Sequence, residues 1–234
     1  LTALYAVDAR RIEVISHGAA MPADHLVAGN GLPFGERPQL LTWGLLGPGK
    51  GIEHVIDAVA LLGDIQPRLR YTVAGVTHPK VFARHGDAYR HELIRRTWAN
   101  GVAGTVTFDD SYRNVAQLTR FVASSSLVVL PYDSRDQVTS GVLVDAIAAG
   151  RPVIATAFPH ASELAVTGAV RVVPHGDPPA LAEAIGDVMG DPSVLARMTA
   201  AAVSLAPSMS WASVADRYLA VCADLDDLTS TVAM

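Results

Sequence analysis

A short polar segment followed by an apolar helical run is the part of this sequence with the clearest chemistry. Thr139, Ser140 and Gly141 open the run, Gly150 ends it, and Pro152 leads into a β-branched segment. A helix that begins here points free backbone N–H groups, two hydroxyls and the positive end of its dipole at one spot. The pattern therefore predicts an anion site, and phosphate is the most natural anion.

Asp145 lies one turn inside the same predicted helix. Its carboxylate has two interpretations: an ordinary acid on an exposed helix surface, or an acceptor for the hydroxyls of a ribose bound at the helix mouth. The Thr-Ser-Gly segment also has a purely structural interpretation, because hydroxyl side chains commonly cap helices. The segment alone leaves both alternatives open.

A glycine-rich loop, Gly44–Gly51, supplies a second group that could hold phosphate. Its spacing fits the phosphate loop of nucleotide hydrolases, but Gly51 stands where those enzymes place a Ser or Thr on Mg²⁺. A nucleotide hydrolase is therefore disfavoured. Gly47 and Gly49 still allow the backbone to approach a ligand, and Lys50 can place its charge on a phosphate. The alternative is a glycine turn with a solvated lysine.

Apolar, β-rich runs alternate with helical patterns through the middle of the chain. This alternation predicts right-handed βαβ crossovers and a doubly wound, Rossmann-like parallel sheet of about six strands, followed by C-terminal helices. In such sheets, ligands bind beyond the carboxyl ends of the strands, so we expect Lys50 and Asp136–Gly141 at one edge. The predicted strands are Leu40–Trp43, Tyr71–Ala74, Thr105–Phe108, Leu127–Leu130, Val153–Thr156 and Val170–Val173. The predicted helices between them cover residues 51–63, 87–100, 114–123, 140–149 and 160–166.

Both ends of the chain depart from this pattern. After the last strand, helices are predicted near residues 179–190, 192–206 and 210–224, with a frayed tail at 225–234. Near the N-terminus, a strand is predicted at Ile12–Ile15, followed by a Gly/Pro-rich connection. One strand cannot form a domain alone. We interpret residues 1–35 as the end of an N-terminal domain with its linker, the alternative being an extra edge strand, and residues 36–224 as the main domain.

Composition excludes several functional classes. A net charge of −5 without Lys/Arg clusters argues against a nucleic-acid groove or an anionic membrane surface. No apolar run reaches the roughly 18 residues of a membrane span. Cys222 is the only cysteine, and residues 1–20 lack a signal-peptide layout, so a cytoplasmic protein is predicted. His17, His160 and His175 lack partners at metal-ligand spacing, so no metal site is predicted.

Taken together, these features resemble the C-terminal, donor-binding half of a GT-B glycosyltransferase of the retaining family 4 type. The similarity runs from Ile12 to about Leu219. Gly44–Gly51 is similar to that family's G-R-L-x-x-x-K-G loop, and Gln137–Pro152 to its E-x7-E segment with the following helix. Ile15–Gly18 is similar to the segment that closes the family's N-terminal domain.

Three positions depart from the family pattern. Leu45 replaces the loop arginine that binds the donor diphosphate together with the lysine, Gln137 replaces the first glutamate, and Asp145 replaces the second. Losing one cation weakens diphosphate binding, which Thr139, Ser140 and the helix N-terminus can offset. Gln137 retains hydrogen-bonding capacity but cannot act as a carboxylate.

The resemblance implies a mechanism without a cofactor or metal. A UDP- or GDP-sugar donor would place its diphosphate on Lys50 and on the helix mouth at Thr139–Gly141, which stabilise the charge of the leaving group. Asp145 would hold the ribose, and Asp136 and Gln137 would orient the sugar. The loop from Asp109 to Arg113 would contact the base.

The resemblance further implies transfer of a hexose, with retention, to a glycan or lipid-linked acceptor. The acceptor site would belong to an N-terminal domain on the same or a separate chain, through which peripheral membrane contact could arise. The isolated chain is then expected to bind donor without transferring efficiently. Two alternatives are a nucleotide-sugar epimerase of the same fold, and a non-catalytic nucleotide-sugar binding module.

Overall fold

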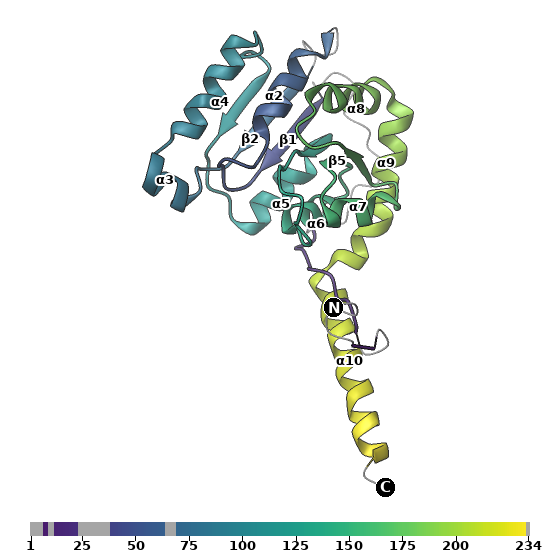
Figure 1. The fold of residues 1–234 in the computed structure, drawn as a ribbon. Coiled ribbons are helices and arrows are strands. Elements are labelled where there is room, and N and C mark those ends of the chain that lie inside the picture. Colours follow the sequence, from purple (N-terminus) through teal and green to yellow (C-terminus); the bar gives the residue numbers. More distant parts are fainter. Residues whose placement is uncertain (1–6, 9–11, 23–37, 64–68, 233–234) are drawn as a thin grey trace.

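A computed structural model describes residues 7–8, 12–22, 38–63 and 69–232, and its centre is a six-stranded parallel sheet (Figure 1). The strand order is β3-β2-β1-β4-β5-β6, so neighbours run outward from β1 in both directions. This arrangement confirms the predicted doubly wound, Rossmann-like sheet. The strands are β1 (Gln39–Trp43), β2 (Arg70–Ala74), β3 (Val106–Asp109), β4 (Leu127–Leu130), β5 (Val153–Thr156) and β6 (Val170–Val173).

The central strands are largely apolar because each face of the sheet covers its own core. Leu40 and Val129 pack into a cluster with α2, α4 and α8, whereas the adjacent Leu41 and Val128 pack into a second cluster with α5, α6 and α7. Side chains alternate between the two faces of a strand, so a strand buried on both sides has few polar positions. The helices are α2 (Ile52–Ala60), α3 (Pro79–His85), α4 (Ala88–Ala99), α5 (Val115–Ala123), α6 (Gly141–Ala148), α7 (Pro159–Ala165), α8 (Pro178–Gly190), α9 (Pro192–Leu205) and α10 (Trp211–Val232), with a 3-10 turn, η3, at Ala206–Met209.

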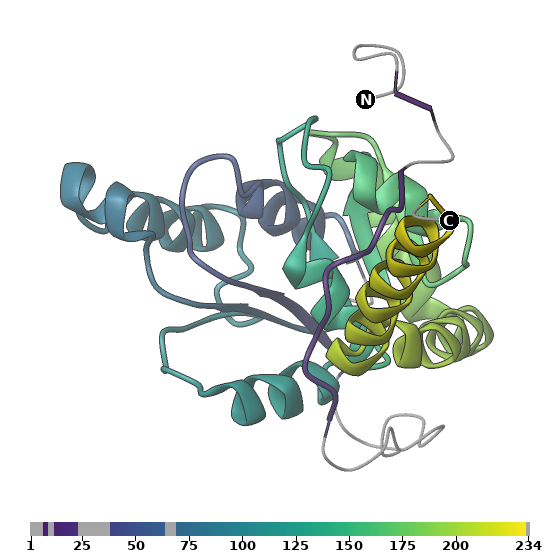
Figure 2. The same cartoon turned by 90° about the horizontal axis from the view of Figure 1, so that it is seen from below.

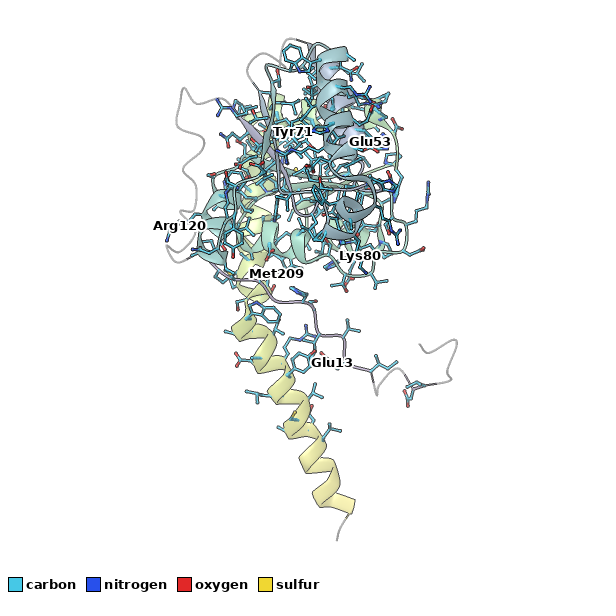
Figure 3. The ribbon with its side chains drawn as sticks, turned by 90° about the vertical axis from the view of Figure 1, so that its left-hand side faces the viewer. Glu13, Glu53, Tyr71, Lys80, Arg120 and Met209 are labelled. Carbon is cyan, nitrogen blue, oxygen red and sulfur yellow. The ribbon has the colours of Figure 1, made fainter. Side chains whose placement is uncertain are left out.

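The N-terminal segment differs from its prediction. Ile12–Ile15 forms no strand; the described N-terminal residues make one isolated bridge, in which the Ala19 N–H donates to the Met209 carbonyl over 2.7 Å. The segment runs beside α10, where Arg217 bonds Glu13 and the Val14 carbonyl (Figures 2 and 3). With no partner strand beside it in the described chain, the alternating pattern of residues 12–15 has no ladder to join. Most of the predicted connection at 23–37 lies outside the described residues.

The C-terminal helix is longer than predicted. α10 continues to Val232, whereas the sequence predicts a helix end near residue 224 and a frayed tail beyond it. The helix projects from the body of the molecule, as Figure 1 shows. Its early part carries exposed apolar side chains, including Trp211, Tyr218 and Leu219. None of the described helices is both long and apolar enough to cross a membrane.

Candidate active site

The strand order reverses direction between β1 and β4, and the loops after these two strands meet there. In open α/β sheets this reversal opens a crevice at the carboxyl ends of the strands. The backbone N–H of Asp133, after β4, donates to the carbonyl of Gly49, after β1, over 3.1 Å. The predicted juxtaposition of the glycine loop with the segment after β4 is therefore present.

The glycine loop owes its path to backbone conformations that other residues rarely adopt. Gly49 and Gly51 have φ values of 89° and 65°. A Cβ on Gly51 would lie 1.8 Å from the Pro131 carbonyl oxygen, so the position admits no side chain. This close approach explains in structural terms why Gly51 occupies the place where a nucleotide hydrolase would need Ser or Thr.

Lys50 is held at this junction without a carboxylate partner in the described chain. Its Nζ lies 4.5 Å from the centroid of the Tyr132 ring, a cation–π contact. Desolvation by burial lowers the pKa of Lys50 below its ordinary value. An anionic ligand would oppose that shift, because an opposite charge nearby favours the protonated amine. Lys50 is thus a half-buried cation suited to an anion.

The N-terminus of α6 has the capped, open form that the sequence predicts. Ser140 is the N-cap, and its Oγ accepts from the Leu143 N–H over 3.2 Å. The N–H groups of Gly141 and Val142 make no hydrogen bond within the described residues. Free amides and the positive end of the helix dipole favour a bound anion here.

His160, on α7, fixes the geometry of this helix start. Its Nδ1 accepts from the Ser140 N–H over 3.0 Å, and its own backbone N–H donates to the Gln137 carbonyl over 3.4 Å. Burial lowers the pKa of His160, while Glu163 opposes the shift. A neutral imidazole is the form that can accept at Nδ1. The sequence prediction considered His160 only as a metal ligand and missed this role.

The remaining polar residues around the helix start have different environments. Asp136 and Thr139 are exposed, and Gln137 donates from Nε2 to the Thr139 carbonyl over 3.3 Å.

Asp145 and His17 lie close together near the helix mouth. Burial raises the pKa of Asp145, and the nearby His17 opposes this shift. His17 also approaches the helix mouth, because a Cβ built on Gly141 would lie 3.6 Å from its Cε1. No hydrogen bond or ion pair joins Gln137 to Lys50 in the described chain.

The β3 loop, residues Asp109–Asn114, lies beside a hollow of about 250 Å³. The hollow is lined by Trp43, Gly44, Gly75 and Tyr112, among others, so the loops after β1, β2 and β3 all contribute to it. Its volume approaches the lower end of the range for ligand pockets, and it opens on the same sheet edge as Lys50. A larger hollow of about 350 Å³, lined by Ser16, Met209 and Arg217 among others, lies between the N-terminal segment and α10.

Asp109 and Arg113, predicted to contact the base, contact each other. They form an ion pair, and Arg113 Nη1 also donates to the Ser111 carbonyl over 3.1 Å. The Arg113 guanidinium lies 3.9 Å from the centroid of the Phe121 ring. The Arg113 hydrogen bond lowers the pKa of Asp109 to about 2. Both side chains therefore shape the loop, and the space for a ligand is the hollow beside them.

Comparison with known proteins decides the family. The family model described as glycosyl transferases group 1 matches residues 37–191. The chain belongs to this family.

Relatives and solved structures of glycosyltransferases agree with this family. D-inositol 3-phosphate glycosyltransferase of Streptomyces scabiei is 30% identical over 94% of this chain and 51% of its own length. The Streptomyces coelicolor protein of the same name is 32% identical over 76% of the chain and 39% of its length. The chain thus spans about half or less of the length of the curated relatives that it matches.

Solved structures share the fold. Sucrose-phosphate synthase from Thermosynechococcus elongatus superposes with a TM-score of 0.71 at 23% identity, covering 92% of this chain and 53% of that one. Anabaena HepE in complex with UDP superposes with a TM-score of 0.68 at 21% identity, covering 80% of this chain and 48% of that one. The glycosyl transferases group 1 chain therefore has the architecture of a GT-B C-terminal half.

Two positions of this group 1 chain gain significance from the structure. Leu45 is exposed and lines the hollow beside the β3 loop, so it supplies apolar surface where the family pattern has an arginine.

Tyr132, which the sequence analysis did not single out, is buried under Lys50 and stacks on Phe158 with ring centroids 5.5 Å apart. Burial raises the Tyr132 pKa, an effect that the adjacent Ser140 side chain opposes. The Tyr132 hydroxyl nonetheless has no properly oriented hydrogen-bond partner in the described chain.

Proposed function

We propose that this chain is the donor-binding portion of a retaining glycosyltransferase that takes a hexose from a UDP- or GDP-sugar. The acceptor is a glycan or a lipid-linked molecule. The family supports glycosyl transfer, and the UDP named with the Anabaena structure supports a nucleotide-sugar donor. The chemistry needs no cofactor beyond the donor substrate itself.

The observation that carries this proposal is the pair of open positive groups at the reversal of strand order. Lys50 has no carboxylate partner in the described chain, and the first amides of α6 have no acceptor there. A donor diphosphate placed between them receives a point charge from one side and backbone N–H groups from the other. Charge developing on the leaving diphosphate is stabilised by groups already oriented for it. A metal ion is not required for that step.

The other predicted residues take supporting roles. The nucleobase enters the hollow beside the β3 loop, whose shape depends on the Asp109–Arg113 pair. Asp145, half-buried next to the helix mouth, accepts from the ribose hydroxyls. Asp136 and Gln137, on the exposed approach to α6, hydrogen-bond the transferred sugar. Gly47 and Gly49 allow the loop backbone to approach the diphosphate.

The acceptor belongs to a separate domain in this proposal. Residues 1–35 are the end of that domain and its linker, and His17 brings the linker to the mouth of α6. Such an arrangement closes the donor site from the linker side. The chain by itself then binds donor, and transfer requires the acceptor domain on the same or a separate chain.

Calorimetric titration of the 234-residue chain with UDP, UDP-glucose and GDP-mannose tests the proposal. Saturable binding is expected, and Lys50→Met is expected to weaken it by roughly 10- to 100-fold, the effect of losing one charge-assisted hydrogen bond. Methionine keeps an apolar stem over the Tyr132 ring and removes the ammonium group with its charge and N–H donors.

Lys80, exposed on α3, is the other lysine of the chain and gives a matched control. Lys80→Met is expected to bind donor as the unsubstituted chain does. Absence of binding to every nucleotide tested, or equal losses from the two substitutions, would contradict the proposed donor site. The chain together with its acceptor domain, incubated with donor alone, should release no epimerised sugar.

A further inference from the structure

Three potential metal ligands converge near the glycine loop although they come from two distant parts of the sequence. Glu53 and His54 lie in the first turn of α2, and Asp133 follows β4. One ligand atom from each side chain lies within 4.8 Å of the other two. Figure 3 labels Glu53 on α2 near Tyr71 of the sheet.

The separations suit a small divalent cation. His54 Nε2 lies 3.4 Å from Asp133 Oδ1. A tetrahedral Zn²⁺ with bonds of about 2.0–2.1 Å separates neighbouring ligands by roughly 3.3–3.4 Å, so these two atoms already stand at the required distance. The Glu53 carboxylate has a ligand atom within 4.8 Å of both, so rotation of this flexible side chain would complete a three-ligand set.

The charges also suit a cation. Neither Glu53 nor Asp133 forms an ion pair with lysine or arginine in the described chain. By contrast, Asp57, one turn along α2, is neutralised by Arg96 over 2.5 Å. The cluster therefore offers an imidazole and two carboxylates that form no ion pair with lysine or arginine in the described chain, and the two negative charges balance a dication.

One ligand is held by a hydrogen bond, and glycines lie beside the other two. Tyr89 donates to Glu53 Oε2 over 2.7 Å, which fixes one carboxylate oxygen and leaves the other available. Glycines flank the cluster: a Cβ on Gly51 would lie 3.4 Å from Asp133 Oδ1, and one on Gly176 would lie 4.0 Å from His54 Nε2. No bulky side chain is placed at either point.

We propose that Glu53, His54 and Asp133 bind one first-row divalent cation, with Zn²⁺ preferred over Mn²⁺ and Mg²⁺. Imidazole with carboxylate ligands favours Zn²⁺, while Mg²⁺ prefers an all-oxygen set. The cation braces the first turn of α2, which follows the glycine loop, against the segment after β4. The three ligands are separate from the residues assigned to the donor diphosphate, so the proposed cation site does not depend on the proposed glycosyltransferase activity.

Titration of the metal-free 234-residue chain with Zn²⁺ by calorimetry tests this site. One equivalent is expected to bind, and His54→Ala and Asp133→Asn are each expected to weaken that binding at least tenfold. Tyr89→Phe, which removes the hydrogen bond to Glu53, is expected to weaken it by about tenfold. Co²⁺ bound at the same site should show the intense visible absorption of a four-coordinate ion, and Asp133→Asn should reduce it.

His85→Ala is the matched control, because His85 is exposed at the end of α3 and makes no contact with the cluster. It is expected to bind Zn²⁺ as the unsubstituted chain does. Circular dichroism of each variant separates loss of a ligand from loss of folding. Absence of one-to-one binding, equal weakening by His85→Ala and His54→Ala, or Mg²⁺ binding as tight as Zn²⁺ would overturn the proposal.

Discussion

Two regions at the same edge of the sheet differ in whether their polar groups have hydrogen-bond or ion-pair partners. Around Lys50 and the start of α6, the amine lacks a carboxylate, two helix amides lack acceptors, and the Tyr132 hydroxyl lacks a partner in the described chain. In the β3 loop, Asp109 and Arg113 pair with each other and with Ser111.

This difference separates a region with unpaired polar groups from a neighbouring region whose polar groups pair with one another. Buried or half-buried polar groups are costly unless they are hydrogen-bonded, so a cluster of unsatisfied ones marks a place where a ligand can supply the missing partners. In the β3 loop, the Asp109 and Arg113 side chains already have partners and hold the shape of the loop. The β3 loop therefore forms one wall of the hollow, and the region around Lys50 lies at the same edge of the sheet without lining that hollow.

Of the substitutions proposed for the region around Lys50, one at Gly51 is expected to have the largest effect on stability. Gly51→Ala forces a Cβ into the Pro131 carbonyl from a left-handed backbone conformation, and we expect a loss of about 3 kcal/mol or more in the free energy of unfolding. Chemical denaturation measures it. Gly49→Ala is the control, because its φ is also positive but no atom lies within 4 Å, and we expect about 1 kcal/mol. Equal losses would show that the close approach to Pro131 is unimportant.

The sequence predicted the sheet because its strands are buried on both faces. The six strands predicted for the main domain are all present within one residue of their predicted ends, since uninterrupted apolar runs such as Leu127–Leu130 have few other stable environments. The helix α3 was missed for the opposite reason: it buries no residue and so carries no apolar period. Ile12–Ile15 had the alternation of a strand, but pairing depends on a neighbour that the local sequence cannot reveal.

The site was predictable only where its chemistry is local. Ser140 caps α6 through a residue three positions away, and a short pattern carries that information. His160 and Tyr132 act through contacts between separate βα units, and neither has a motif of its own. The ion pair between Asp109 and Arg113 could not be predicted from the sequence either, because their four-residue spacing also fits two separate contacts with a ligand.

A double-mutant cycle on the Asp109–Arg113 ion pair tests whether this pair stabilises the β3 loop. Asp109→Asn and Arg113→Gln are expected to show a coupling of about 1 kcal/mol in the free energy of unfolding, because both side chains are only about one-fifth exposed, at 22% and 20%. The Arg171–Asp187 pair, at 36% and 52% exposed, is the control and is expected to show less. A coupling no larger than that of the control would mean that the pair does not hold the loop.

The same pair predicts a response to acid. The pKa of Asp109 is lowered to about 2, so its stabilising contribution is present above the unfolded value near 4 and is lost as the pH falls toward 2. Thermal unfolding between pH 5 and 2 is therefore expected to change less in Asp109→Asn than in the unsubstituted chain. Parallel pH profiles for the two proteins would contradict this linkage.

His160 gives the open region a pH dependence near neutrality. Its pKa is lowered in the folded chain, so the folded state favours the neutral ring, and stability present above about pH 6.5 is lost as the pH falls below that value. His160→Asn keeps an acceptor for the Ser140 N–H and does not titrate, so its stability should vary less between pH 8 and 5. His160→Ala removes the acceptor and is expected to cost about 1 kcal/mol at pH 8. Equal pH slopes in the unsubstituted chain and His160→Asn would exclude this role.

Tyr132→Phe tests whether the open region really carries an unsatisfied group. The hydroxyl is buried and unpartnered in the described chain, so its removal is expected to raise the free energy of unfolding by roughly 0.5 kcal/mol, whereas removing a satisfied buried hydroxyl lowers it. Tyr71→Phe is the control, because the Tyr71 hydroxyl donates to Thr42 Oγ1 over 3.0 Å, and it is expected to destabilise by about 1 kcal/mol. Opposite signs for the two substitutions support a polar group kept free at the base of the Lys50 site. A destabilisation of similar size in both would show that Tyr132 is satisfied and that the contrast between the two regions rests on Lys50 and the α6 amides alone.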